Sequence, residues 1–140
     1  MYTALLAMVF KVPTLAHVIP SQDRGSVFAV TSFGDNVLVL RQNSEQIEVY
    51  DAETFTLQCL ITVPGLCSLF FGLAACAVNQ CVYASTNNCN IHRVELSGSN
   101  AMKKWSVVGC PAGLSVNKAH NLVVACCLAN KLQEYTTHLC

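Results

Sequence analysis

The chain has 140 residues, of which 53% are hydrophobic and only 11% are charged. Eight Lys and Arg residues balance eight Asp and Glu residues. Disordered chains combine low hydrophobicity with high net charge, so this composition excludes a disordered tail. A neutral chain also lacks the basic surface that binds phosphates, and we expect no nucleic-acid partner.

An internal repeat organises the chain. Each unit contains an apolar run, a polar linker and a second run of alternating character. The units recur at offsets of 44 and 41 residues, with the paired runs at 35–40 and 47–51, 79–84 and 91–95, and 120–125 and 132–136. Alternation is typical of a strand with one buried and one exposed face.

The flanks of these runs repeat as well. Gly72 and Leu73 correspond to Gly113 and Leu114 at the offset of 41, and residues 28–30 are their counterpart in the first unit. After the second run, residues 61–65 correspond to 105–109 at the offset of 44. One unit is therefore four short strands in about 42 residues, which matches the period of a four-stranded propeller blade.

Two segments resemble known propeller repeats. Residues 46–54 (QIEVYDAET) resemble the third strand and exit turn of a WD-repeat or YVTN-type blade, with Tyr50-Asp51 where Trp-Asp often stands. Residues 72–84, followed by 90–94, are similar to the NHL pattern. The likeness covers about 27 to 135. It implies an all-β, β-propeller-like fold of about three four-stranded antiparallel blades in an incomplete ring.

The repeat predicts the organisation of the chain. We expect an N-terminal segment (1–15), an outer strand (16–20), two blades (27–63 and 71–108) and a partial blade (112–140). Residues 16–20 lie 44 positions before 60–64, and both segments end in proline. By resemblance, such a first strand completes the last blade of a ring.

Three blades are too few for a closed ring, since propellers have four to eight. Three alternatives are open. The chain is a fragment of a longer propeller, or two chains form a homodimer with six blades, or the chain is a three-bladed monomer.

Residues 60–78 form an apolar window within a stretch, 54–92, that contains no charged residue. About 20 apolar residues can span a bilayer, so a single-span membrane protein is one alternative. Pro64-Gly65 marks a turn inside the window, however, which favours two strands of adjacent blades and no membrane partner. None of the nine cysteines forms a C-x-x-C pair. We therefore expect reduced, buried cysteines in a cytoplasmic protein.

Motifs for catalysis, metal binding or cofactor binding are absent from the sequence, and we expect no cofactor. Cys89 and His92 are interpreted as a turn cysteine and an exposed strand histidine. The resemblance places binding residues in loops at the mouths of a central channel. The candidates in the turns between first and second strands are Asp35, Asn79, Gln80, Asn117, Lys118 and His120. A second loop set contains Arg41, Asn43, Asn87, Asn88 and Asn130.

Two interpretations of these turns are open. Asn and Asp favour turns because they cap their own backbone, or the residues bind a ligand. The sequence favours a non-catalytic module that binds a protein partner through these loops and the channel mouth. The alternative is part of a six-bladed, metal-assisted hydrolase or lactonase, whose Ca²⁺ site needs several converging Glu, Asp and Asn residues. Asp35 is the only acidic residue of the first loop set.

Overall fold

The computed structural model describes residues 12–16, 18, 25–66 and 70–137, and this part of the chain contains eleven strands and no helix. Sheet 1 consists of β1 (Val27–Phe33), β2 (Asn36–Arg41), β3 (Gln46–Asp51) and β4 (Leu57–Thr62). Sheet 2 consists of β5 (Phe70–Cys76), β6 (Cys81–Thr86), β7 (Asn90–Glu95) and β8 (Met102–Ser106). Sheet 3 consists of β9 (Pro111–Val116), β10 (Leu122–Cys126) and β11 (Lys131–Tyr135).

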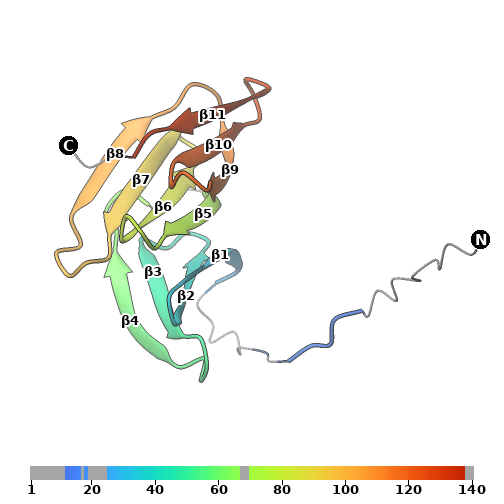
Figure 1. Cartoon of the computed structure of the whole chain (residues 1–140), viewed down its shortest axis with the longest axis vertical. Coiled ribbons are helices and arrows are strands. Elements are labelled where there is room, and N and C mark those ends of the chain that lie inside the picture. The colour runs from blue at the N-terminus through green and yellow to red at the C-terminus, as the bar shows by residue number, and fades with distance from the viewer. Residues whose placement is uncertain (1–11, 17, 19–24, 67–69, 138–140) are drawn as a thin grey trace, which may run out of the picture.

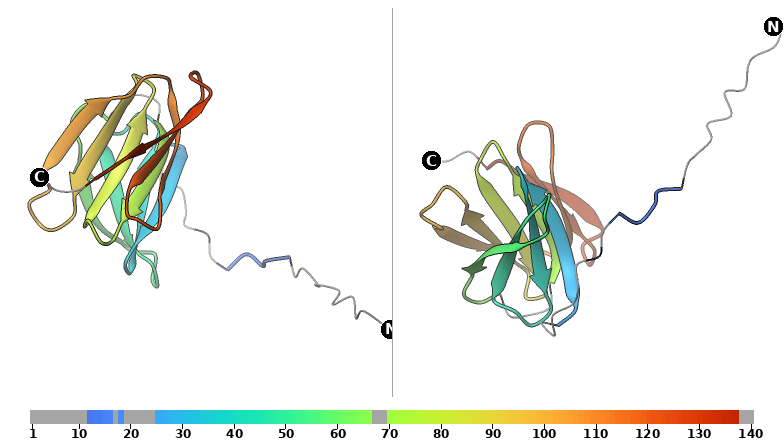
Figure 2. Two further views of the ribbon diagram at one scale, coloured as in Figure 1. Left: turned by 45° about the horizontal axis from the view of Figure 1, so that its top comes forward. Right: turned by 90° about the horizontal axis from the view of Figure 1, so that it is seen from below.

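Each sheet is an antiparallel meander in which the strands are paired in chain order. The first strands of the three sheets, β1, β5 and β9, contact one another in succession. Figures 1 and 2 show the sheets packed face to face around this line of first strands. The predicted fold class, an all-β chain of propeller-like blades in an open ring, is confirmed.

Two apolar layers hold the sheets together. Between sheets 1 and 2, side chains of β2 and β3 pack against side chains of β6 and β7; the buried members include Leu38, Leu40, Ile47, Val49, Val82, Ala84 and Val94. Between sheets 2 and 3 the layer includes Cys81, Tyr83, Ile91, Leu122, Val124 and Cys126. Complete burial of one large apolar side chain contributes about 1.5–3 kcal/mol. Sheet 2 is therefore covered on both faces.

The turns between second and third strands share one backbone feature. Each contains a residue with positive φ: Asn43 (58°), Cys89 (62°) and Asn130 (51°). Asn adopts this left-handed region more readily than most residues do. The conformation recurs although the side chains differ, which shows that the repeat extends to the turns.

The predicted outer strand over 16–20 falls on residues 17, 19 and 20, which lie outside the described residues; residues 16 and 18 are described and form no strand. The described residues of the apolar window 60–78 belong to the end of β4, the connection after it, β5 and the turn that follows. No helix long and apolar enough to cross a membrane occurs in the described ranges.

Candidate interaction surfaces

The six predicted binding residues lie in the three turns that connect the first and second strands of each sheet. Asp35 lies between β1 and β2, Asn79 and Gln80 between β5 and β6, and the remaining three between β9 and β10. In sheets 1 and 2 the turn is tied to its neighbour between the third and fourth strands. The Ala52 N–H donates to the Asp35 carbonyl oxygen at 2.8 Å, and the Leu96 N–H donates to the Gln80 carbonyl oxygen at 2.7 Å. Paired turns thus form one rim at this end of the strands.

Sheets 2 and 3 are joined at this rim by a small hydrogen-bond network. The Asn79 side-chain amide donates to the His120 carbonyl oxygen at 3.2 Å and to Thr137 Oγ1 at 2.8 Å. Thr137 Oγ1 in turn donates to the His120 carbonyl oxygen at 2.9 Å. The structure therefore brings Asn79 and His120 together, and the amide of Asn79 is used to hold the two turns.

Asn117 also stabilises its own turn. Its Oδ1 accepts hydrogen bonds from the N–H groups of Ala119 and Asn121, both at 3.0 Å. Its amide donates to Glu134 at 2.7 Å, and the Asn121 amide donates to the same carboxylate at 2.8 Å. Hydrogen bonds from Asn121 and Asn117 lower the pKa of Glu134. Gln80 is likewise turned back, donating from Nε2 to the Ala77 carbonyl oxygen at 2.6 Å.

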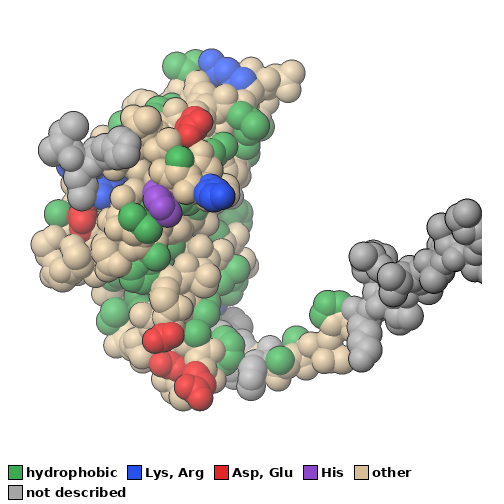
Figure 3. Space-filling model, viewed as in Figure 1, with side chains coloured by type: hydrophobic (Ala, Val, Ile, Leu, Met, Phe, Trp, Pro, Cys, Tyr) green, Lys and Arg blue, Asp and Glu red, His purple; other side chains and the backbone are tan. Residues whose placement is uncertain are grey.

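Asp35, Lys118 and His120 remain as exposed side chains of the rim, and in the described part of the chain their polar side-chain atoms make no hydrogen bond or ion pair. Asp35 lines a shallow hollow of about 350 Å³ with Asp51 and Glu53. Acidic side chains gather at the lower tip of the molecule in Figure 3, whereas its upper part carries a histidine, basic side chains and further acidic side chains. No hydrogen bond among the described residues joins Asp35 to Asn79 or His120.

The Asp51 carboxylate in this hollow serves the turn that follows β3. It accepts hydrogen bonds from the N–H and hydroxyl of Thr54 at 2.8 and 3.0 Å and from the Glu53 N–H at 2.9 Å. These bonds lower its pKa, so the carboxylate is charged at neutral pH. These bonds all go to Oδ1, whereas Oδ2 accepts one longer bond, from Gln58 Nε2 at 3.4 Å.

A buried polar network lies on the outer face of sheet 1. Arg41 Nε donates to both carboxylate oxygens of Glu48, at 2.9 and 3.1 Å, and its Nη1 donates to the Gly25 carbonyl oxygen at 3.0 Å. The Tyr50 hydroxyl donates to Glu48 at 2.6 Å. Burial, and then the hydrogen bond to Glu48, raise the pKa of Tyr50. Arg41 is therefore a buried residue at the end of β2 and not part of a loop as predicted, and its partners were not predicted from the sequence.

This network adjoins an apolar cleft of about 300 Å³ on the same face. The cleft is lined by Val27, Val30, Val37, Val39, Arg41, Tyr50 and Phe55. The sequence contains a signal for this network. Gln133 and Tyr135 lie 85 residues after Glu48 and Tyr50, so an acceptor followed two residues later by tyrosine occurs in both sheets. In sheet 3 the Tyr135 hydroxyl donates to Gln133 at 2.7 Å, which repeats the geometry of sheet 1.

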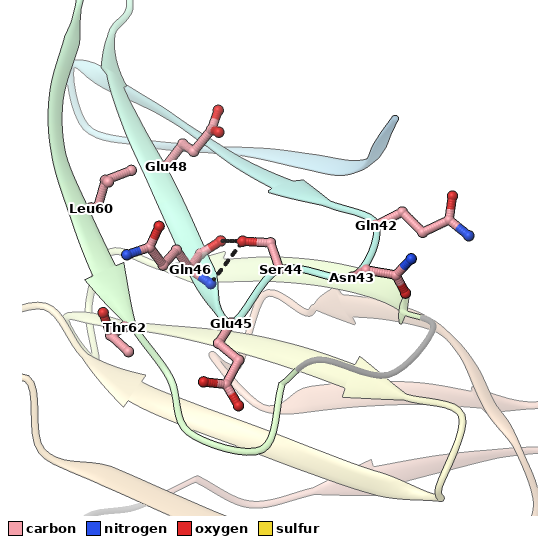
Figure 4. Close-up of a pocket in the computed structure, with 8 residues that line it drawn as sticks. All are labelled: Gln42, Asn43, Ser44, Glu45, Gln46, Glu48, Leu60 and Thr62. Carbon is pink, nitrogen blue, oxygen red and sulfur yellow. Dashed lines mark hydrogen bonds between the residues drawn. The ribbon is translucent and has the colours of Figure 1, made fainter. Parts of the chain in front are cut away.

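A polar hollow of about 600 Å³ lies beside the turn between β2 and β3 (Figure 4). Ser44 turns back and accepts a hydrogen bond from the Gln46 N–H at 3.1 Å, while Gln42 points away from the strand pair. No group of three or more His, Cys, Asp or Glu residues in the described ranges is placed to hold a metal ion.

The expectation for His92 was wrong, and the expectation for the cysteines was wrong in part. His92 is buried, with only 4% of its surface exposed, and not an exposed strand residue. It points into the layer between sheets 1 and 2, and burial, followed by the charge of Lys104, lowers its pKa. Among the described cysteines, Cys76, Cys81 and Cys126 are buried as expected, but Cys59 and Cys127 are exposed.

Meanders of four strands packed face to face around their first strands define a β-propeller fold. No family model and no curated protein sequence matches the chain. Solved structures do match it. The β-propeller domain of Cps50 (Swd1) from Myceliophteria thermophila is 13% identical, with a TM-score of 0.63 over 86% of this chain and 41% of that chain.

Two further structures are similar. Hydrazine synthase from Kuenenia stuttgartiensis is 13% identical, with a TM-score of 0.61 over 89% of this chain and 40% of that chain. A chain of the mitotic checkpoint complex is 14% identical, with a TM-score of 0.63 over 81% of this chain and 36% of that chain. The chain thus spans less than half the length of the structures it matches.

Proposed function

We propose that this chain is a non-catalytic, cytoplasmic protein-interaction module of the β-propeller type, related to WD, YVTN and NHL repeats. It binds a protein partner through the rim formed by the turns between first and second strands. One observation carries the proposal: Asp35, Lys118 and His120 are exposed on turns whose other polar groups are bonded internally. The mitotic checkpoint complex, which contains a similar propeller domain, supports a role in a protein assembly.

Such a rim suits protein recognition because its side chains are presented on braced turns. Because the turns are already ordered, binding a partner costs little conformational entropy in the turns. The acidic and basic groups lie in different turns, so a partner of complementary charge pattern has one favoured orientation.

The test is a quantitative binding assay with a partner identified by cross-linking to the wild-type chain. Lys118→Glu and His120→Asn change the rim, and Asn tolerates the positive φ of 64° at position 120. The matched control is Lys131→Glu, which changes the same charge at the start of β11 and away from the rim. We expect the rim variants to weaken binding at least tenfold and the control to leave it unchanged. Equal loss in rim variant and control contradicts the proposal.

We also propose that a second copy of the chain completes the ring as a six-bladed homodimer. Support comes from two uncovered faces. Val27 and Val30 on sheet 1 are 57% and 61% exposed, and Leu128 and Leu132, beside and within β11, are 82% and 74% exposed. Among the described residues, sheet 3 also has no fourth strand beside its edge strand β11. The predicted strand 16–20 suits this place.

Native mass spectrometry tests this second proposal. We expect a species of twice 15.1 kDa. Val30→Asp should shift it to the monomer, whereas Val108→Asp, at a still more exposed valine between β8 and β9, should not. A wild-type mass of 15.1 kDa at micromolar concentration contradicts the homodimer.

A further inference from the structure

Three cysteines gather at the end of the strands opposite the rim. Cys89 lies in the turn between β6 and β7, Cys110 directly precedes β9, and Cys127 directly follows β10. They come from three connections that are distant in sequence. Cys110 and Cys127 flank the adjacent strands β9 and β10 of sheet 3, so the register of this strand pair, which shifts between Ala125 and Cys126, shows how they lie relative to each other.

Cys110 and Cys127 face each other across an antiparallel strand pair. Cys126 is paired with Pro111, so the next pair outward is Cys127 with Cys110. The Cys127 N–H donates to the Cys110 carbonyl oxygen at 2.9 Å. Hydrogen-bonded antiparallel pairs have Cα atoms about 5.5 Å apart, and disulfides span Cα separations of about 4.4–6.8 Å. Residues paired in this way lie within the Cα range of a disulfide, and the Cys127 thiol is close enough to the Cys110 thiol to affect its pKa.

Close packing fixes the segment that carries Cys110. Gly109 has φ +88°, and a Cβ atom at this position would lie 2.7 Å from the Ala129 Cβ and 3.2 Å from the Cys126 Cβ. Only glycine allows the connection before β9 to lie this close to the turn after β10. The backbone around both thiols is thus held by direct contact.

The two thiols differ in their access to solvent. Both are free, but Cys127 is exposed and Cys110 is only partly so. Burial and the adjacent Cys127 thiol, with smaller contributions from Cys89 and Cys126, raise the pKa of Cys110. A dissolved oxidant therefore meets Cys127 first, and Cys110 stays a protonated thiol beside it.

We propose that Cys110 and Cys127 form a thiol–disulfide site that reacts with low-molecular-weight disulfides of the glutathione class. The Cys127 thiolate attacks one sulfur of the disulfide, forming a mixed disulfide and releasing one thiol. Cys110 loses its proton to solvent and attacks Cys127 Sγ, which releases the second thiol. The two cysteines are oxidised by two electrons in total, and one disulfide is reduced to two thiols.

The disulfide joins the residue before β9 to the residue after β10. It closes the hairpin 110–127 covalently at the end opposite the rim. A disulfide of this loop length stabilises the folded chain, and we expect the Tm of the oxidised chain to be higher by roughly 5 to 10 °C.

Peptide mapping of the full chain, equilibrated with oxidised glutathione and then alkylated, tests the site. Trypsin separates the cysteines by cleaving after Arg41, Arg93, Lys104, Lys118 and Lys131. Cys110 is in peptide 105–118, Cys126 and Cys127 are in 119–131, and Cys89 is in 42–93. We expect one dominant link between 105–118 and 119–131, which reverses with dithiothreitol.

Variants assign the link within peptide 119–131. The link should survive in Cys126→Ala and in the control Cys59→Ser, which removes another exposed cysteine, and it should vanish in Cys127→Ser. A link that persists in Cys127→Ser overturns the proposal, as does a dominant link from 105–118 to 42–93 or a product that stays a glutathione mixed disulfide.

Phenylarsine oxide gives a second measurement on the unmodified chain, independent of the stability of any variant. This trivalent arsenical binds two neighbouring thiols and releases water. One equivalent should protect Cys110 and Cys127 together from alkylation. Protection of a different pair, or of none, contradicts the site.

Discussion

Sheets 1 and 2 have the same four-stranded design, but they differ in what covers their faces. Sheet 2 is enclosed by sheets 1 and 3, and every residue of β6 is buried. On the outer face of sheet 1, Arg41, Glu48 and Tyr50 are instead hydrogen-bonded in one network that includes the Gly25 carbonyl oxygen. At positions 44 residues later, facing sheet 1, sheet 2 has His92 and Val94.

This difference shows how a repeat adapts to its neighbours. A face covered by another sheet can use apolar side chains, because dispersion and burial stabilise it. A face without such a cover needs its own polar bonds. Sheet 3 is intermediate between the two. Its residues Gln133 and Tyr135 form the same hydrogen bond as Glu48 and Tyr50 in sheet 1. Tyr135 also packs against Trp105 of sheet 2, with ring centroids 5.9 Å apart.

The largest expected effect comes from opening the covered face. Leu40 is fully buried between sheets 1 and 2, so Leu40→Ala should lower the free energy of unfolding by roughly 2–5 kcal/mol. The matched control is Val30→Ala on the outer face, which should cost less than about 0.5 kcal/mol in dilute solution. Urea unfolding measures both. Equal losses would show that the two faces are covered alike.

The second effect comes from breaking the polar network. Glu48→Ala leaves the buried guanidinium of Arg41 without its charged partner, and we expect a loss of about 3 kcal/mol in the free energy of unfolding. Gln133→Ala in sheet 3 removes a neutral acceptor and should cost only about 1 kcal/mol. Equal losses of stability in the two variants would contradict the idea that the charge of Glu48 makes the network of sheet 1 more sensitive than the neutral pair of sheet 3.

His92 offers a smaller effect that depends on pH. Because its pKa in the folded chain lies below the ordinary value of 6.5, the unfolded chain binds the proton more readily. Stability should be complete above about pH 6.5 and fall by up to about 1.4 kcal/mol per unit as the pH drops toward the folded pKa. His92→Gln, which copies the residue of sheet 3, should reduce this slope. An unchanged slope would assign the acid sensitivity to other groups.

The smallest expected effect is that of calcium. The rim carboxylates of Asp35, Asp51 and Glu53 line one hollow, but Oδ1 of Asp51 is bonded within its turn, and these side chains are not placed as a metal-binding group among the described residues. Millimolar Ca²⁺ should therefore shift the Tm by less than about 1 °C, with Mg²⁺ as the control. A larger, calcium-specific rise would support the metal-assisted hydrolase instead.

The repeat was sufficient to predict the fold, because period-two alternation and recurring turns are local properties of the sequence. It was not sufficient to predict which face each residue occupies. Leu38 and Val82 are 44 residues apart, yet they pack in the same layer from opposite sheets. The strands β2 and β6 begin 45 residues apart, at Asn36 and Cys81, whereas β3 and β7 begin 44 residues apart, and a shift of one residue exchanges the faces of a strand.

The candidate site was predictable to a similar degree. The sequence placed the six residues in turns, but it could not show that the amides of Asn79, Gln80 and Asn117 are bonded internally. Those bonds depend on neighbours such as Thr137 and Glu134, whose positions follow from the packing of the sheets. The burial of His92 depends on sheet 1 in the same way.

The enclosure of sheet 2 has a consequence for motion. Amide protons exchange with solvent when the strands that bear them open, and opening is hardest where both faces are packed. The amides of β6 and β7 should therefore exchange most slowly, and those of β4 and β11, at sheet edges, most rapidly. Local unfolding then begins at the edges and reaches the middle sheet last, since its strands lose their cover only after a neighbouring sheet has separated.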